Sequence, residues 1–223
     1  MLNTGIRGQI IATAALLLLY WALLAFVPFG GHPAGTIEPQ VNLAEYVGTL
    51  VLGPFADSDK PYTWVLSSLG FAATVLFGIL AGHLLRGDND GWYKLRGLVA
   101  IGVGLIVLGE VWNLLHPINK YIWTSSMTVW TAGWCYLMLA VFYLFIDLLG
   151  YRKLAFPFIV LGANALVAYM SGYFIRFDEI AAILFHGEAR MGITGNFFQA
   201  VAAFMILWLA LYWMYKKKVF IRI

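Results

Sequence analysis

GQIIATAALLLLYWALLAFV, residues 8–27, contains no charged side chain over twenty residues and follows Arg7. A helix rises 1.5 Å per residue, so this run spans about 30 Å, the thickness of the hydrocarbon core of a bilayer. It is longer than the apolar region of a signal peptide, and no A-x-A cleavage site follows it. We therefore predict a retained transmembrane helix.

The composition of the whole chain indicates an integral membrane protein. Of its 223 residues, 62% are hydrophobic and 11% charged, and the mean hydropathy is +0.82. Soluble domains carry about 25% charged residues, so this chain has too few to cover a water-soluble globule. The formal net charge of +3 is too small and dispersed to predict nucleic acid as a partner. The expected partner is the lipid bilayer.

Six apolar segments are long enough to cross a membrane, and they lack the alternation of barrel strands. Backbone groups in lipid must bond within their own segment, so each segment is predicted to be a helix. The sequence predicts an all-α bundle in a single polytopic domain, residues 1–223. The predicted helices are 8–27, 64–85, 95–115, 124–147, 156–173 and 197–215.

Lysine and arginine residues in the connections predict the orientation. If both termini lie on one side, that side receives ten of these cations and the other side four. The positive-inside rule then places both termini in the cytoplasm. The expected location is the inner (cytoplasmic) membrane of the cell. The connection 28–63 becomes an external loop with five of the seven prolines and a short interfacial helix near Asn42–Leu52.

Small residues predict close helix packing at two places. Gly70, Thr74, Gly78 and Gly82 recur every four positions in the second segment, which is the spacing of a ridge that admits a neighbouring helix. In the third segment, Gly102 and Gly109 are seven apart and should serve the same purpose.

Outside residues 116–126, few residues could support chemistry. The single cysteine, Cys135, is predicted to be a small core residue, and His32, His83 and His186 show no metal-ligand spacing, so no metal is expected. No phosphate loop or hydrolase motif is present. Polar groups at membrane depth are costly and usually face a bundle interior or a wet cavity. Glu110, close to Asn113, is one such group.

Asn164 is another polar group at membrane depth, near the middle of the fifth segment. Pro157, Asn164 and Ser171 are spaced by seven, so a continuous helix would place them on one stripe, with Pro157 opening the helix. The stripe could line a cavity, or Asn164 could make an interhelical hydrogen bond. The sequence does not separate these two interpretations.

HPINKYIWTSS, residues 116–126, concentrates polar side chains between two apolar segments. As a turn, His116-Pro117 would end a helix, and Thr124, Ser125 or Ser126 would cap the next one. As a site, the helix N-terminus, Lys120 and the hydroxyls would favour an anion, with Glu110 as the partner of Lys120.

The same stretch resembles a known family. Pro117-Ile118-Asn119-Lys120 followed by Trp123-Thr124-Ser125-Ser126 is similar to the P-[IV]-N-K-x-x-W-[ST]-x-S signature of bacterial relatives of heparan-α-glucosaminide N-acetyltransferase. The resemblance extends over essentially the whole chain. It continues at Glu38-Pro39, Asn42-Leu43, Leu52-Gly53, Thr74, Leu76-Phe77-Gly78, Ala81-Gly82-His83, Asp147, Gly150, Gly162, Asn164-Ala165, Tyr169, Tyr215-Lys216-Lys217-Lys218-Val219-Phe220 and Arg222-Ile223.

The resemblance implies a multi-pass acyltransferase that takes an acetyl group from cytoplasmic acetyl-CoA and delivers it to an extracytoplasmic sugar, periplasmic or in the cell wall. The family carries its catalytic histidine in an N-terminal half, whereas this chain resembles the C-terminal half. No histidine here matches that motif, so no catalytic residue is assigned, and the chain is expected to be inactive alone. A separate N-terminal half or a homo-oligomer would complete it.

Within this hypothesis, the cavity residues for coenzyme A and the sugar are Asn119, Lys120, Trp123, Ser125, Asn164 and Glu110. The alternative is a non-enzymatic membrane module, either a small-molecule permease or a packing subunit of a membrane complex. The absence of a catalytic set favours that alternative. Against a permease, the sequence shows no inverted repeat and no paired intramembrane acids.

Overall fold

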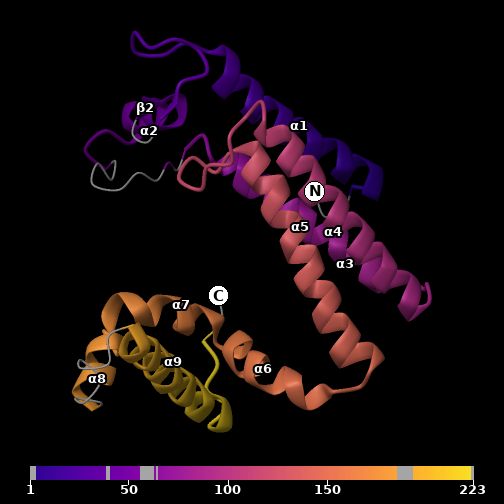
Figure 1. Ribbon diagram of the computed structural model, residues 1–223, viewed down its shortest axis with the longest axis vertical. Coiled ribbons are helices and arrows are strands. Elements are labelled where there is room, and N and C mark those ends of the chain that lie inside the picture. Colours follow the sequence, from indigo (N-terminus) through magenta and orange to yellow (C-terminus); the bar gives the residue numbers. More distant parts are fainter. Residues whose placement is uncertain (1–3, 39–40, 56–62, 64, 185–192, 222–223) are drawn as a thin grey trace. The chain divides into compact units, whose positions relative to one another are not determined.

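The computed structural model describes residues 4–38, 41–55, 63, 65–184 and 193–221 (Figure 1). Helices dominate these residues, and the strands are one short antiparallel pair, β1 Ile37–Glu38 and β2 Val41–Asn42. Five described helices are long and apolar enough to cross a membrane, and a bent pair of shorter helices gives a sixth if it counts as one span. The predicted all-α membrane fold is confirmed: the chain is a multi-pass membrane protein.

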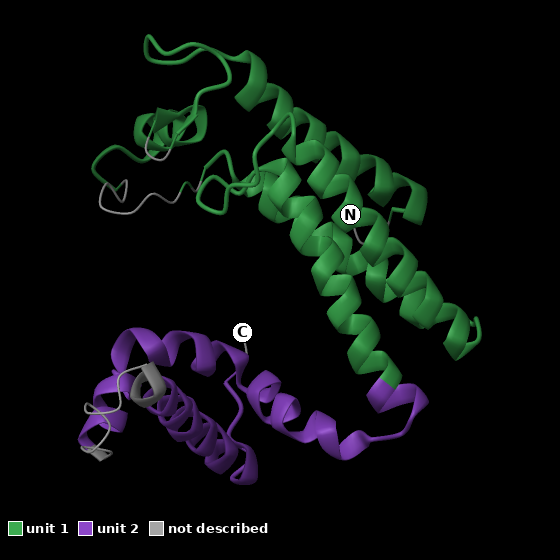
Figure 2. Cartoon of the chain, viewed as in Figure 1, with its two compact units in different colours: residues 1–144 green, residues 145–223 purple. Residues whose placement is uncertain are grey.

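The chain forms two compact units, Met1–Leu144 and Phe145–Ile223 (Figure 2). Four long helices lie together in unit 1 (Figure 1). They are α1 Ile6–Phe26, α3 Ser68–Arg86, α4 Gly91–Asn113 and α5 Ser125–Phe142, which continues across the unit boundary as the π-helix η2 Tyr143–Leu148.

The ends of α4 differ from the predicted segment 95–115 because polar side chains set them. Asp90 caps the start, accepting a hydrogen bond from the Trp92 amide at 3.0 Å, so the helix begins four residues before the apolar run. At the other end, the Asn113 side chain accepts from the Ile118 amide at 2.8 Å and turns the chain away from the helix axis.

Glycines allow α4 and α5 to pack closely, as predicted for Gly102 and Gly109. A Cβ atom on Gly109 would lie 2.7 Å from the Trp130 Cβ, and one on Gly102 would lie 3.0 Å from the Gly133 carbonyl oxygen. Gly133 of α5 is equally restricted, because its Cβ would lie 2.7 Å from the Gly102 carbonyl oxygen. These distances are shorter than real Cβ contacts, so larger residues would force the helices apart.

The predicted small-residue ridge on α3 is correct for one position and wrong for two. A Cβ on Gly70 would lie 2.8 Å from the Trp123 ring, so Gly70 does permit a close contact. A Cβ on Gly78 or Gly82 would meet nothing within 4 Å. These two glycines instead line an open cavity between α3 and α5.

The described part of the predicted external loop folds against the end of α1. A helix is present where the sequence predicts one, as α2 Leu43–Leu52, followed by the 3-10 turn η1 Gly53–Phe55. Asn42 caps α2 by accepting from the Glu45 amide at 2.8 Å. A buried apolar cluster joins the loop to α1 and to the turn after α4; its members are Tyr20, Leu24, Phe29, Leu43, Ala44 and Ile122.

Unit 2 contains α6 Phe156–Ala163, α7 Ala165–Phe174, α8 Phe177–Leu184 and α9 Ile193–Lys216, preceded by the 3-10 turn η3 Arg152–Ala155. The predicted single helix 156–173 is wrong, because α6 and α7 meet at Asn164 with a bend of 61°. The Pro157–Asn164–Ser171 stripe therefore does not exist, although Pro157 does lie in the first turn of α6. The connection between the predicted helices 156–173 and 197–215 contains α8, and its His186 and Arg190 lie outside the described residues.

Candidate functional site: a recessed polar turn

Residues 116–126 form a turn that is held mainly by hydrogen bonds to side chains. The Asn119 Oδ1 atom accepts hydrogen bonds from the Tyr121 amide at 2.9 Å and the Ile122 amide at 3.4 Å. These bonds reverse the chain between α4 and α5. The side-chain oxygen of Asn119 is therefore already used within the protein.

Thr124 caps α5, which selects one of the three predicted capping residues. Its Oγ1 atom accepts from the Met127 amide at 3.4 Å and from the Asn119 amide at 3.1 Å. The same hydroxyl lies 3.0 Å from the Pro117 carbonyl oxygen, to which it can donate. One side chain thus joins the start of α5 to both halves of the turn.

Two further hydrogen bonds tie the turn to the middle of α1. The Ser125 hydroxyl donates to the Leu17 carbonyl oxygen at 2.8 Å, and the Tyr20 hydroxyl donates to the Ile122 carbonyl oxygen. Leu17 precedes the end of α1 at Phe26 by nine residues, or about 13 Å of helix. The turn is therefore recessed beside α1 rather than placed at its tip.

Trp123 connects the turn to α3. Its φ angle of 55° lies in the left-handed region, which is unusual for a bulky residue. The ring packs against Gly70, and its Nε1 atom donates to the Thr74 hydroxyl at 3.4 Å. Gly70 has to be a glycine for this ring to fit, because a Cβ there would overlap it.

The structure brings Asn119, Trp123 and Ser125 together but not the other predicted site residues. Glu110 and Lys120 are both exposed, and no ion pair between them forms among the described residues. That predicted pair is wrong, because Glu110 lies on the exposed face of α4 while Asn119 holds the turn that carries Lys120.

Asn164 lies in unit 2 and is completely buried. Its Nδ2 atom donates to the Val219 carbonyl oxygen, and its Oδ1 atom accepts from the Ile221 amide, both at 3.0 Å. Neither the cavity nor the interhelical interpretation describes this residue. Asn164 instead holds the segment that follows α9, and its own backbone leaves the helical conformation, with φ −131°.

Sequence reasoning missed His116. The side chain is 1% exposed, and within the described structure neither ring nitrogen has a hydrogen-bond partner. Burial lowers the pKa of His116 to about 4, so the imidazole is neutral at physiological pH. Its place before a proline at a helix end gave no sign of this, because residues distant in sequence create the burial.

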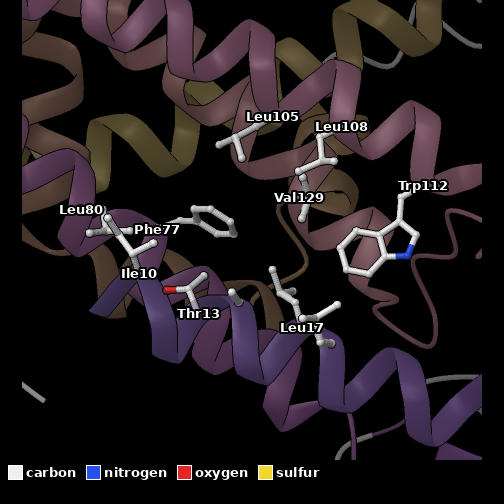
Figure 3. Close-up of a pocket in the computed structure, with 11 residues that line it drawn as sticks. Ile10, Thr13, Leu17, Phe77, Leu80, Leu105, Leu108, Trp112 and Val129 are labelled. Atoms are coloured by element: carbon white, nitrogen blue, oxygen red, sulfur yellow. The ribbon is translucent and has the colours of Figure 1, made fainter. Parts of the chain in front are cut away.

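Two apolar cavities adjoin the helices that hold the turn. One, of about 530 Å³, follows α3 from Thr74 to Leu85 and is also lined by Trp123, Cys135 and Tyr136. The other, of about 460 Å³, lies among α1, α3 and α4, with Val129 of α5 (Figure 3).

Comparisons with known proteins identify no relative. No family model matches the chain, and no curated protein matches it. Among the described residues, no three His, Cys, Asp or Glu side chains are grouped to hold a metal ion.

Proposed function

We propose that the chain is the C-terminal membrane half of an acyltransferase that moves an acetyl group from acetyl-CoA to a sugar on the other side of the membrane. The observation that carries this proposal is the position of Trp123. Its indole belongs both to the polar turn, where the family-like signature lies, and to the cavity that follows α3. A polar, rigid end and a long apolar side suit a thioester arm that delivers an acyl group.

The length of this cavity fits a slender acyl carrier. From Thr74 to Leu85 the helix rises about 16 Å, so the cavity extends over roughly half of the hydrocarbon thickness. Gly78 and Gly82 leave room along it, and its few polar groups include Thr74 and Thr131. In the proposed orientation, with both termini cytoplasmic, the Leu85 end faces the acetyl-CoA pool of the cytoplasm.

In acetyl transfer to an amine, the nitrogen attacks the thioester carbonyl, the carbon–sulfur bond breaks, and the amine proton passes through a base to the departing thiolate. The developing oxyanion needs donors, and the amine needs a general base. Trp123 Nε1 and the Thr74 hydroxyl line the cavity and would serve as donors in exchange for their present bonds to the Thr74 hydroxyl and the Gly70 carbonyl oxygen. Asn119 and Ser125 fix the turn. Lys120, exposed in the same turn, would attract an anionic group on the external side in the proposed orientation. The base would come from a histidine-bearing N-terminal half of the kind that the family carries.

Cys135, the single cysteine, is exposed, so its predicted place in the core is wrong. Because it lines this cavity, it reports directly on the cavity's occupancy. The test is the rate of Cys135 alkylation by N-ethylmaleimide in purified protein, with and without acetyl-CoA. We expect acetyl-CoA to slow alkylation several-fold. Gly78→Leu, which fills the cavity, should abolish this protection, whereas Gly104→Leu, on an open face of α4, should retain it. An alkylation rate that acetyl-CoA leaves unchanged would refute the proposed donor cavity.

A separate experiment tests whether this chain needs a histidine-bearing half for acetyl transfer. Membranes that contain this chain alone should transfer no label from acetyl-CoA to glucosamine or muropeptide acceptors. Co-expression with a histidine-bearing half should restore transfer. Robust turnover by the chain alone would show that the base lies within it.

A second candidate function, a packing subunit of a membrane complex, is favoured by the exposed face of α4. Val103, Val107, Glu110 and Leu114 follow helical spacing, and all four are exposed. A carboxylate close to the hydrocarbon is costly unless a partner supplies a donor. If a partner helix covers this face, Glu110→Leu should abolish its co-purification, while Leu108→Ala should have a smaller effect. Equal recovery with both variants would refute the packing role.

A further inference from the structure

A pocket in unit 2 combines two cations with two apolar side chains. It has a volume of about 520 Å³ and is lined by Arg152, Lys153, Phe156 and Ile159. All four residues are exposed, and they belong to η3 and to the first half of α6. The pocket therefore has a charged half and an apolar half, and each half limits the kind of ligand that can occupy it.

The charged half has no counterion within the described structure. The ion pair that the described residues contain joins Arg176 to Glu179, and none forms with Arg152 or Lys153, although Asp147 lies only a few residues before them. Two adjacent cations without a carboxylate partner attract an anion, and the guanidinium of an arginine can pair with two oxygens of one phosphate. The charged half therefore suits a phosphate group.

Backbone hydrogen bonds set the position of the two cations relative to α6. Gly150 has a φ angle of 75°, in the left-handed region that favours glycine. On either side of this turn, the Tyr151 amide donates to the Phe145 carbonyl oxygen at 2.9 Å, and the Arg152 amide donates to the Gly150 carbonyl oxygen at 2.8 Å. The chain therefore leaves η2 through a defined turn, and Arg152 and Lys153 come immediately before the helix that carries the apolar half.

The apolar half lies on a helix that is long and apolar enough to enter the bilayer. Phe156 and Ile159 are three residues apart, so they share one face of α6, and both are exposed. This helix is part of the bent pair that counts as a sixth membrane span. A soluble anion would gain nothing from these side chains, whereas an acyl chain would bury them. The pocket therefore fits an amphiphile with an anionic head.

The end of α9 brings further positive charge to the same place. The Phe156 ring contacts the Tyr212 ring, with centroids 6.0 Å apart, and the Lys216 Nζ atom lies 5.7 Å from the centroid of that Tyr212 ring. Lys217 and Lys218 follow and are also exposed. In the orientation predicted from the sequence, these cations face the cytoplasmic leaflet, whose anionic lipids attract clusters of this kind.

We propose that this pocket binds an anionic phospholipid, with the phosphate at Arg152 and Lys153 and one acyl chain along Phe156 and Ile159. The site lies entirely within unit 2 and shares no lining residue with the cavity that contains Trp123. It does not depend on the acyl-transfer proposal.

The test is lipid binding by the whole chain in dodecyl maltoside, with the bound lipids counted by native mass spectrometry. Phosphatidylglycerol and phosphatidylcholine with the same acyl chains differ in net charge, because the choline cancels the charge of the phosphate. We expect the first phosphatidylglycerol to bind about tenfold more tightly than the first phosphatidylcholine. Equal affinity for the two lipids would overturn the proposal.

Two double variants separate the pocket from the net charge of the chain. Arg86 and Arg96 are exposed like Arg152 and Lys153, but they do not line the pocket. Arg152→Gln with Lys153→Gln should remove most of the preference for phosphatidylglycerol, whereas Arg86→Gln with Arg96→Gln should retain it. Both variants lose two positive charges, so an equal loss of preference would mean that net charge selects the lipid and that the pocket does not.

Two exposed isoleucines of unit 2 test the place of the acyl chain. Ile159 lines the pocket, whereas Ile180 of α8 does not. Ile159→Trp should weaken the binding of phosphatidylglycerol several-fold because the indole fills the apolar half, and Ile180→Trp should leave it unchanged. The same affinity in both variants would refute the assigned path of the chain.

Soluble anions distinguish a lipid from a free phosphate compound as the ligand. Glycerophosphoglycerol has the head group of phosphatidylglycerol without the chains, and pyrophosphate has neither glycerol nor chains. In a large molar excess, neither compound should displace the bound phosphatidylglycerol. Displacement by either one would identify a site for a soluble phosphate compound and would refute the lipid assignment.

Discussion

Lowering the pH from 7.5 to 5 should destabilise unit 1 through His116. An unfolded histidine has a pKa of about 6.5, whereas burial lowers the pKa of His116 in the folded protein to about 4. Between these two values the unfolded chain binds a proton that the folded protein does not. The contribution of His116 to the free energy of unfolding is therefore complete above the pKa of the unfolded histidine. It decreases as the pH falls toward 4, and below about pH 4 it decreases no further.

The magnitude follows from the two pKa values. One pKa unit corresponds to about 1.4 kcal/mol, and pH 5 lies about 1.5 units below the pKa of the unfolded histidine and above that of the folded one. His116 should then cost about 2 kcal/mol of unfolding free energy at pH 5 relative to pH 7.5. For a chain of this size, that loss lowers Tm by about 4–8 °C.

The assay is thermal unfolding in nanodiscs, followed by tryptophan fluorescence at several pH values, for wild type and His116→Gln. Glutamine does not titrate, so the variant should lack this part of the pH dependence. Burial raises the pKa of Glu45, which acts in the opposite direction, but Glu45 is present in both proteins and cancels in the comparison. Parallel curves of Tm against pH for the two proteins would refute a buried, neutral His116.

Three further predictions concern packing and capping. Gly109→Leu should destabilise the α4–α5 contact by about 1–3 kcal/mol or prevent folding, whereas Gly104→Leu should be tolerated; thermal melts of the two variants check this. Asn164→Ala removes two hydrogen bonds and should cost about 2 kcal/mol, with faster hydrogen exchange at the Ile221 amide as the direct measurement. Thr124→Ala should lower the free energy of unfolding by about 1 kcal/mol because the α5 cap is lost, whereas Thr124→Ser should retain most of that stability; chemical denaturation of the two variants measures the difference.

Much of the polar turn could be predicted from its own residues, because its key bonds are local. Pro117 and the Asn119 amide lie within seven residues of Thr124, and Asn119 acts on amides two and three residues later. Asn, Thr and Ser form such bonds wherever the chain turns, so the capping of α5 was foreseeable from residue type and spacing. The partners of the turn in α1 and α3 were not foreseeable, since they lie more than forty residues away.

Asn164 shows why the bend in unit 2 escaped prediction. The apolar run 156–173 is consistent with a single helix, and an asparagine within it would ordinarily be tolerated. The partners of its side chain are Val219 and Ile221, more than fifty residues later. Only when the end of the chain folds back does Asn164 gain these bonds and leave the helical conformation.

The same distinction separates the small-residue positions. Gly102, Gly109, Gly78 and Gly82 all have the spacing of packing positions, yet the first two contact α5 and the last two face a cavity. Spacing shows which residues share a helix face, but it does not show which of them a side chain of the neighbouring helix covers.

By itself the sequence determined that this protein crosses the membrane as helices, because uninterrupted apolar runs leave backbone groups no partners in lipid except those within a helix. It also determined the local caps and turns, whose donors and acceptors are near neighbours. Only the tertiary structure decided the burial of His116, the bend at Asn164 and the two cavities. These depend on contacts between residues far apart in sequence, whose geometry is set by the packing of whole helices.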